Sequence, residues 1–332
     1  MIVARAPYRI SFFGGGTDYP EWFRDHGGAF LSLAINHYCY IALRIKPPFQ
    51  EKRYRISWRI TEDVSNIESI KHPIVKHSLK YMKIDNGMDI NYVGDLPGGS
   101  GLGSSSAFTV ALNHALHTTL GNKPNALELA NQAYYIERKK LNETIGIQDQ
   151  IATAFGGFNY VIIKKDGSYI IEKVLLTKKQ IECFLSRVIL VYTGISRLAS
   201  SVSEKKVKDI VKKESIVSEM QEMVLEGKKL IQQDKIDEYG KLLDHNWKLK
   251  RSISDVVSNE EIDNLYSLAK KNGAIGGKLL GAGSGGFLIF LCKEGQKEKV
   301  SKIFDTKMIV PFGLCNHGSQ IVYDEMKSYE FL

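Results

Sequence analysis

The chain has 332 residues, of which 43% are hydrophobic and 25% charged, and its formal net charge is +8. Such a composition is ordinary for a soluble globular protein, and the length allows two domains. The positive charge favours an anionic partner without choosing among a small anion, nucleic acid and a membrane surface. No apolar run approaches the ~20 residues that span a bilayer, so we expect no contact with a membrane. We find no signal peptide, and the four cysteines lack C-x-x-C spacing, which predicts reduced thiols in a cytoplasmic protein.

The first part of the chain predicts strands followed by a helix. Extended patterns cover Ile2–Phe13, which Gly14-Gly15-Gly16 interrupts, and then Ala29–Ile45 and Tyr54–Ile60. Pro73–Met82 has helical spacing, and a further strand is expected at Asp89–Gly94.

A loop rich in glycine and serine, Asp95–Ala107, joins that strand to a predicted helix at Ala107–Leu116. Glycines let a ligand approach the backbone, and the free N–H groups at a helix start favour an anion. The loop therefore predicts a nucleotide-phosphate site, with a flexible linker as the alternative. It is not a Walker A motif, because Ser104 stands where that motif requires a lysine.

The next predicted helix, Ala126–Leu141, carries Glu137 on the same apolar stripe as Ala133 and Ile136. A carboxylate buried there needs a cation, because an unpaired buried charge is costly. Two interpretations stay open: Glu137 binds Mg²⁺ near nucleotide phosphates, or it forms a structural ion pair.

Two aspartates are further candidates. Asp149 lies in the first turn of a predicted helix, Gln148–Phe155, where it is either functional or an ordinary capping residue. Asp18 follows three glycines in an irregular loop, where it either faces a ligand or stabilises a turn.

The second part of the chain begins with a predicted hairpin around Asp166-Gly167, followed by the polar stretch Leu175–Glu182, which we interpret as a domain boundary. A buried strand at Val188–Tyr192 precedes a largely helical region over residues 200–272. The glycine run Gly281–Gly286 lies between two apolar runs and predicts a tight turn between strands. Because strands and helices do not alternate strictly, the pattern favours an α+β fold.

Three segments together resemble the motifs of the GHMP small-molecule kinases, the family of galactokinase, homoserine kinase, mevalonate kinase and phosphomevalonate kinase. Ala6–Arg9 with Gly14–Tyr19 resembles motif 1, Pro97–Ala107 the ATP-phosphate loop, and Lys278–Gly286 motif 3. Their order and spacing match across nearly the whole chain. The resemblance implies a ribosomal-S5-like N-terminal domain over residues 1–178 and a ferredoxin-like C-terminal domain over residues 179–332.

The resemblance also implies roles for single residues. Asp149 corresponds to the catalytic aspartate and Arg9 to the basic residue beside it. Ser105 (or Ser104) and Glu137 correspond to the Mg²⁺ ligands, so ATP and Mg²⁺ are the expected cofactors. The expected ATP-binding residues are Pro97, Gly98, Gly99, Ser100, Gly101, Leu102, Gly103, Ser104, Ser105 and Ser106. The expected substrate-binding residues are Gly16, Thr17, Asp18, Gly194, Arg197 and Gly283.

Within the family, motif 1 departs from the galactokinase pattern G-E-H-T-D, since Gly15 and Gly16 replace the acid and the imidazole. This version, with Gly194–Arg197 and Lys278, resembles bacterial D-glycero-D-manno-heptose 7-phosphate kinases. It implies ATP-dependent phosphorylation of the sugar C1 hydroxyl to the 1,7-bisphosphate, on the way to GDP-heptose and surface polysaccharide. Other cations that could hold the substrate phosphate are Arg44, Lys250, Arg251 and Lys278.

The main alternative is another sugar 1-kinase, of the fucokinase or galactokinase type. A remote alternative is a basic RNA-binding protein, although no RRM, KH or aromatic-rich basic strand is visible. We therefore expect ATP and a sugar phosphate as partners, no nucleic acid, and a monomer or homodimer.

Overall fold

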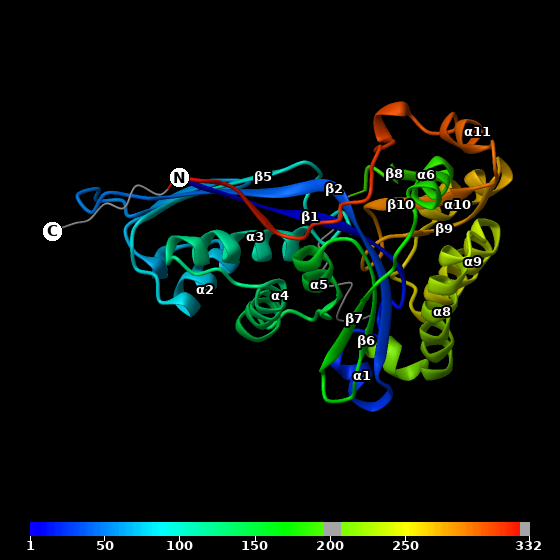
Figure 1. Ribbon diagram of the computed structural model, residues 1–332, viewed down its shortest axis with the longest axis horizontal. Helices are drawn as coiled ribbons and strands as arrows, with labels where there is room; N and C mark the ends of the chain where they lie inside the picture. Colours follow the sequence, from blue (N-terminus) through cyan, green and yellow to red (C-terminus); the bar gives the residue numbers. More distant parts are fainter. Residues whose placement is uncertain (196–206, 326–332) are drawn as a thin grey trace.

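The computed structural model describes residues 1–195 and 207–325, and these residues form an α+β structure with two sheets (Figure 1). The α+β prediction is confirmed. In chain order the elements are β1 (Ile2–Phe13), α1 (Pro20–His26), β2 (Gly28–Ile45), β3 (Tyr54–Ser57), β4 (Thr61–Val64), the 3₁₀ turn η1 (Ile67–Ser69), α2 (Pro73–Met82), β5 (Met88–Gly94), α3 (Ser104–Thr119), α4 (Ala126–Tyr134), the π-helix η2 (Tyr135–Lys140), α5 (Gln148–Phe155), β6 (Phe158–Ile163), β7 (Tyr169–Lys173), α6 (Lys178–Arg187), β8 (Val188–Tyr192), α8 (Glu214–Gln232), α9 (Ile236–Ile253), α10 (Glu260–Lys271), β9 (Ala274–Leu279), β10 (Phe287–Cys292), α11 (Lys297–Ser301), the 3₁₀ turn η3 (Thr306–Met308) and β11 (Gln320–Asp324).

The larger sheet is organised around the long strands β1 and β2. Its order is β11-β1-β2-β5-β3-β4, and the hairpin β6-β7 joins the first half of β2. Helices α2 to α5 cover one face (Figure 1). The second half of β2 alternates accordingly: Cys39, Ile41 and Leu43 are buried, whereas Arg44 is exposed. This pattern is typical of an antiparallel sheet with one covered face.

The smaller sheet has the order β8-β10-β9, and a single bridge from Val191 to Ile309 adds one more segment beside β8. With helices between β8 and β9 and after β10, this is the ferredoxin-like order that the resemblance implies. The predicted hairpin around Gly281–Gly286 is confirmed as β9-β10. β8 is buried on both faces, because Leu190 belongs to the main core and Ile189 to a second apolar cluster.

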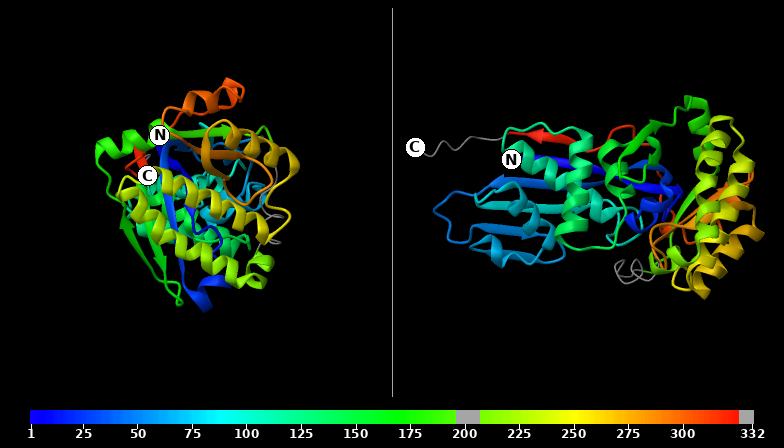
Figure 2. Two further views of the ribbon diagram at one scale, coloured as in Figure 1. Left: turned by 90° about the vertical axis from the view of Figure 1, so that its right-hand side faces the viewer. Right: turned by 90° about the horizontal axis from the view of Figure 1, so that it is seen from below.

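Aromatic side chains connect the part of the molecule built on the larger sheet to the part built on the smaller sheet. These two parts lie end to end in Figure 2. Phe12 and Phe13, at the end of β1, pack against Tyr239 of α9 with ring centroids 5.7 and 5.3 Å apart. Phe184 of α6 contacts Phe12 and Tyr239 at 5.8 and 5.9 Å. Edge-to-face contacts of this kind add to the free energy of apolar burial, so they stabilise the junction between the two parts.

The segment that we interpreted as a boundary is half helical. Thr177 and Gln180 form a capping box that starts α6 inside Leu175–Glu182. The last strand, β11, pairs with β1 and so returns to the first sheet. A division at residues 178 and 179 stays a prediction. Among the described residues, no helix is long and apolar enough to cross a bilayer.

The two glycine loops meet backbone to backbone. The Phe287 N–H donates a hydrogen bond to the Ser100 carbonyl at 3.2 Å. A Cβ atom at Gly286 would lie 2.2 Å from that carbonyl oxygen, and one at Gly281 would lie 2.5 Å from the Gly101 Cα. Only glycine allows this approach, which brings the loop before α3 against the small sheet.

This contact predicts the effect of Gly286→Ala. The added methyl group would force the loops apart and should lower the free energy of unfolding by more than the ~1–2 kcal/mol expected for a positive φ alone. Gly295→Ala is the matched control, because Gly295 also has a positive φ but a Cβ added there would have no heavy atom within 4 Å. Denaturant unfolding measures both, and equal losses would contradict the prediction.

Candidate active site

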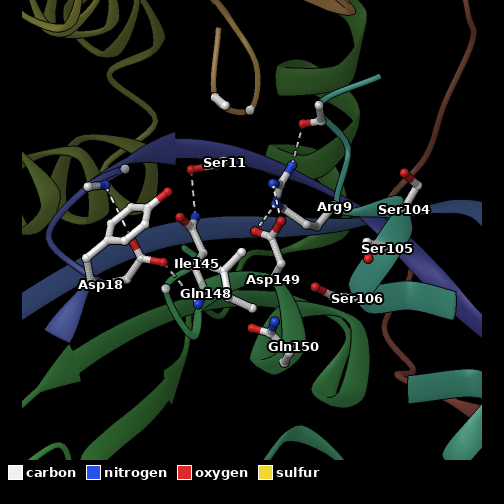
Figure 3. Close-up of a pocket in the computed structure, with 18 of the residues that line it drawn as sticks. Arg9, Ser11, Asp18, Ser104, Ser105, Ser106, Ile145, Gln148, Asp149 and Gln150 are labelled. Atoms are coloured by element: carbon white, nitrogen blue, oxygen red, sulfur yellow. Dashed lines mark hydrogen bonds and ion pairs between the residues drawn. The ribbon is translucent and has the colours of Figure 1, made fainter. Parts of the chain in front are cut away.

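A cavity of about 220 Å³ opens where the larger sheet, α3, η2, α5 and the β9-β10 turn converge (Figure 3). It collects segments from the start, middle and end of the chain, so it is a product of tertiary structure. The residues that line it are Arg9, Ser11, Gly15, Gly16, Asp18, Tyr19, Gly99, Gly101, Gly103, Ser104, Ser105, Ser106, Glu137, Glu143, Ile145, Gly146, Gln148, Asp149, Gln150, Lys250, Lys278, Gly281 and Ala282.

The predicted phosphate loop forms one wall of the cavity. α3 starts at Ser104, three residues before the predicted start, and its N-cap Gly103 has φ 74° and provides no side-chain cap. The first N–H groups of a helix lack intrahelical partners, so this end suits an anion. Of the predicted ATP-binding residues, those in the lining are Gly99, Gly101, Gly103, Ser104, Ser105 and Ser106. Pro97, Gly98, Ser100 and Leu102 lie outside it, and Ser100 and Leu102 are buried behind the loop.

Arg9 and Asp149 form a two-pronged ion pair at the centre of the cavity (Figure 3). Arg9 Nε donates to Asp149 Oδ1 at 2.7 Å and Nη2 donates to Oδ2 at 2.6 Å. Arg9 Nη1 donates to the Gly101 carbonyl at 2.6 Å. Arg9 is 5% exposed and Asp149 30%, so the carboxylate remains open to a ligand. The N-cap of α5 is Ile147, with no side-chain cap hydrogen bond, which disfavours a capping role for Asp149.

Glu137 is buried, as its stripe predicted, but no cation of the described residues pairs with it. Its carboxylate accepts hydrogen bonds from four neutral groups. Ser105 Oγ and Thr109 Oγ1 donate to Oε1 at 2.8 and 3.0 Å, and Ser106 Oγ and Gln150 Nε2 donate to Oε2 at 3.0 and 2.5 Å. Burial raises the pKa of Glu137 to about 7 despite these donors. Of the two interpretations, the structural ion pair is therefore not found among the described residues, where hydroxyl and amide groups hold the carboxylate.

The helix around Glu137 differs from the predicted one. The expected α-helix Ala126–Leu141 ends at Tyr134 and continues as the π-helix η2. A π turn inserts an extra residue into the helical register and is frequent at functional sites.

The predicted substrate residues divide into two groups. Asp18 and Gly16 line the cavity, and Asp18 accepts hydrogen bonds from the N–H groups of Gly16 and Gln148, both at 3.2 Å. A Cβ at Gly146 would lie 2.0 Å from Asp18 Oδ2, so this glycine is required. The other predicted residues are not in the lining: Thr17 bonds to the Gly14 and Ala29 carbonyls, Gly194 lies near Met308 and Gly283 near Val257, and Arg197 lies outside the described residues.

Two of the four other candidate cations, Lys250 and Lys278, line the cavity and are buried. Lys278 Nζ donates to the Phe12 carbonyl at 2.7 Å, and Lys250 Nζ donates to the Gly281 carbonyl at 2.8 Å. Arg44 and Arg251 instead pair with Asp89 and Asp263 outside the cavity.

Sequence reasoning missed Glu143, Gln148 and Gln150. Gln148 Nε2 donates to Ser11 Oγ at 2.6 Å, and Gln150 bonds to Glu137. For the two glutamines, the available signal was consecutive polar residues at the start of a short, otherwise apolar helix, because amides that such a helix buries require partners. Glu143 carried no comparable signal.

The oxygen atoms near Glu137 suit a hard cation. Ser105 Oγ and Glu137 Oε1 lie 2.8 Å apart, and Gln150 Oε1 is buried without a hydrogen-bond partner. Mg²⁺ takes oxygen ligands and usually binds one or two carboxylates together with phosphates and water. No group of three His, Cys, Asp or Glu side chains in the described ranges could hold a metal ion. The residues present therefore fit a cation that takes some of its ligands from the protein and the others from the phosphates of a bound substrate.

Comparison with known proteins agrees with this architecture. The family model for the GHMP kinase N-terminal domain matches residues 70–157 and that for the GHMP kinase C-terminal domain matches residues 228–309. A D-glycero-alpha-D-manno-heptose 7-phosphate kinase of Campylobacter jejuni is 28% identical over 315 residues, covering 91% of this chain and 92% of the relative. A galactokinase of Thermotoga neapolitana is 26% identical, covering 90% and 91%.

A solved structure has the same fold. It is described as a D-glycero-D-manno-heptose 1-phosphate kinase from Bacteroides thetaiotaomicron, with a TM-score of 0.81 at 22% identity, covering 98% of this chain and 100% of that one. Both family domains are matched in order on either side of a cavity that the three motifs line, and the chain therefore belongs to the GHMP kinases, as an ATP-dependent sugar kinase.

Proposed function

We propose that this kinase phosphorylates the C1 hydroxyl of D-glycero-D-manno-heptose 7-phosphate and gives the 1,7-bisphosphate, on the way to GDP-heptose and surface polysaccharide. The observation that carries the reaction type is the Arg9–Asp149 pair, which lies between the phosphate loop and Asp18. The similarity to the Campylobacter jejuni heptose 7-phosphate kinase over 91% of the chain supports the substrate.

The phosphate loop would hold the donor. GHMP kinases use ATP, and the N–H groups of residues 99–106 with the dipole of α3 favour its β- and γ-phosphates. A side chain at Gly101 would also meet the Leu280 carbonyl oxygen at 2.5 Å. Substitution of Gly101 therefore disturbs the contact between the glycine loops as well as nucleotide binding.

Ser105 and Glu137 would hold Mg²⁺. When bound, the ion neutralises charge on the triphosphate and orients it. Glu137 is held by its four donors, so its carboxylate is oriented before a cation arrives.

Asp149 would orient the sugar C1 hydroxyl and accept its proton. Phosphoryl transfer mainly requires positioning and charge stabilisation. Arg9 fixes the Asp149 carboxylate through two parallel hydrogen bonds and would offset negative charge on the transferring group. Asp18 would accept hydrogen bonds from sugar hydroxyls. In Figure 3 it lies on the side of Gln148 that faces away from Asp149.

The alternative is a fucose- or galactose-type 1-kinase, favoured by the similarity to a galactokinase over 90% of the chain. Against galactose, Gly15 and Gly16 line the cavity where galactokinases carry an acid and an imidazole. An ADP-release screen over sugars and sugar phosphates distinguishes these substrates.

The screen should show strong selectivity for the substrate phosphate. The cavity holds the buried cations Lys250 and Lys278 beside Arg9, and a charge-assisted contact contributes about 1.5–3 kcal/mol. We expect kcat/KM for the heptose 7-phosphate to exceed that for the unphosphorylated heptose more than tenfold. Equal use of both sugars would favour the fucose- or galactose-type function. Arg197, the arginine among the expected substrate-binding residues, is tested by Arg197→Ala. This variant should have an increased KM for the sugar phosphate and an unchanged KM for ATP.

The Asp149→Asn variant should fold and bind ATP but lose turnover by about 10²–10⁴-fold, the usual contribution of a general base. The amide retains the shape of the carboxylate but cannot accept the proton. The control is Asp25→Asn, at an exposed position on α1, which should keep full activity. Single-turnover kinetics at saturating substrate measures the loss, and turnover above half of the wild-type value would exclude a catalytic role.

The Glu137→Gln variant tests the cation site. If Glu137 binds Mg²⁺, the substitution should raise the Mg²⁺ concentration for half-maximal rate by about tenfold, since loss of a ligand or its support costs 10–100-fold in affinity. A structural role alone would lower Tm and leave the Mg²⁺ dependence unchanged.

Burial of Glu137 also predicts a pH dependence of stability without metal. Its folded-state pKa of about 7 lies above the ordinary 4.5, so the folded state binds more protons between these values. The free energy of unfolding should therefore fall as pH rises from about 4.5 to 7. Thermal melts should show a shallower decline in Glu137→Gln than in the wild-type protein; identical slopes would mean that Glu137 is not the group responsible.

A further inference from the structure

Glu143 lies in the turn between η2 and α5 and lines the same cavity as Glu137. Its backbone is tied to the π-helix, because the Glu143 N–H donates to the Glu137 carbonyl at 3.1 Å. The Arg138 guanidinium reaches the carbonyl oxygens of Glu143 and Ile145 at 3.5 and 3.3 Å and also bonds to Glu21. The turn is thus held against the helix that carries Glu137.

The Glu143 carboxylate makes no hydrogen bond or ion pair with any residue in the described ranges. The adjacent cation, Arg138, uses its guanidinium on Glu21 and on backbone carbonyls. Two carboxylates, Glu137 and Glu143, therefore line one cavity, and neither forms an ion pair with a cation in the described ranges. Like charges at one cavity repel each other, and an external cation would relieve this repulsion.

The amide oxygen of Gln150, which lines the same cavity, also suggests a cation as the ligand. Gln150 is fully buried, and its Nε2 is used on Glu137 Oε2 at 2.5 Å. Its Oε1 has no hydrogen-bond partner. Figure 3 shows Gln150 on α5 beneath Asp149 and near Ser106, at the edge of the cavity. An unpaired buried amide oxygen is costly, and a hard cation accepts such an oxygen as a ligand.

We propose that Glu143 is a second carboxylate ligand of the divalent cation bound by Ser105 and Glu137, and that Gln150 contributes its amide oxygen to the same site. This assignment rests on the proposed Mg·ATP chemistry and deepens it. With two carboxylates, a hydroxyl and an amide, the protein alone would bind the cation more strongly than one carboxylate and one hydroxyl would.

The test uses Mn²⁺ as a spectroscopic substitute for Mg²⁺ with the full chain and a non-hydrolysable ATP analogue. Free Mn²⁺ is measured by electron paramagnetic resonance. Glu143→Gln should raise the Kd for Mn²⁺ about tenfold, and the KM for the sugar should not change. Glu226→Gln, an exposed position on α8, is the control for loss of one negative charge and should leave both values unchanged.

Other outcomes separate this inference from the proposed function. If Glu137→Gln weakens Mn²⁺ binding and Glu143→Gln does not, only the role of Glu143 is overturned. If Glu143→Gln raises the KM for the sugar with unchanged Mn²⁺ affinity, Glu143 binds sugar hydroxyls instead. If the wild-type protein binds no Mn²⁺ with the nucleotide, the proposed function itself fails. Glu143→Asp serves if the glutamine variant does not fold, and its shortened carboxylate should weaken Mn²⁺ binding likewise; full wild-type affinity would overturn the proposal.

Discussion

The contact between the two glycine loops is the constraint on which the rest of the site depends. Gly101 and Gly281 approach so closely that a Cβ on either would overlap the backbone of the other loop. Hydrogen bonding between Ser100 and Phe287 adds direction to this contact. Because no side chains intervene, the start of α3 lies directly beside the small sheet. Lys250 and Lys278, which belong to the second half of the chain, thereby reach a cavity that the first half builds.

Within this frame, Arg9 connects Asp149 to the glycine loop before α3. One guanidinium bonds to Asp149 on α5 and to the Gly101 carbonyl of the phosphate loop, and its residue lies on β1, an interior strand of the larger sheet. Three segments therefore share a single rigid planar group. The glycine loop and Asp149, the proposed base, cannot shift independently without breaking a buried, charge-assisted hydrogen bond. This arrangement provides the positioning that phosphoryl transfer requires.

The buried charge of Glu137 is stabilised differently from the charge of Asp149, which pairs with Arg9. Its four donors are neutral, so they orient the carboxylate without cancelling its charge. The raised pKa reflects this incomplete compensation. A structural salt bridge would have filled the same space with an arginine or lysine and would have left no site for a dissociable cation. No such partner is present in the described ranges, so the carboxylate of Glu137 stays available for a ligand. The Glu143 carboxylate and the Gln150 amide oxygen likewise have no partner in the described ranges.

The local sequence by itself determined where the glycine loops lie and which face of its helix Glu137 occupies. Glycine spacing, helix-start serines and the inward position of Glu137 are local properties, because backbone freedom, capping and helical periodicity depend on near neighbours. They predicted both glycine loops, the hairpins β6-β7 and β9-β10, and the burial of Glu137, but not the hairpin β3-β4 within and after the expected strand Tyr54–Ile60. Only the tertiary structure decided which predicted residues face the cavity: Asp18 does, whereas Thr17, Gly194 and Gly283 do not. It also decided the π turn and the partners of Glu137, which come from α3 and α5, since hydrogen bonds between distant segments depend on packing that no local pattern encodes.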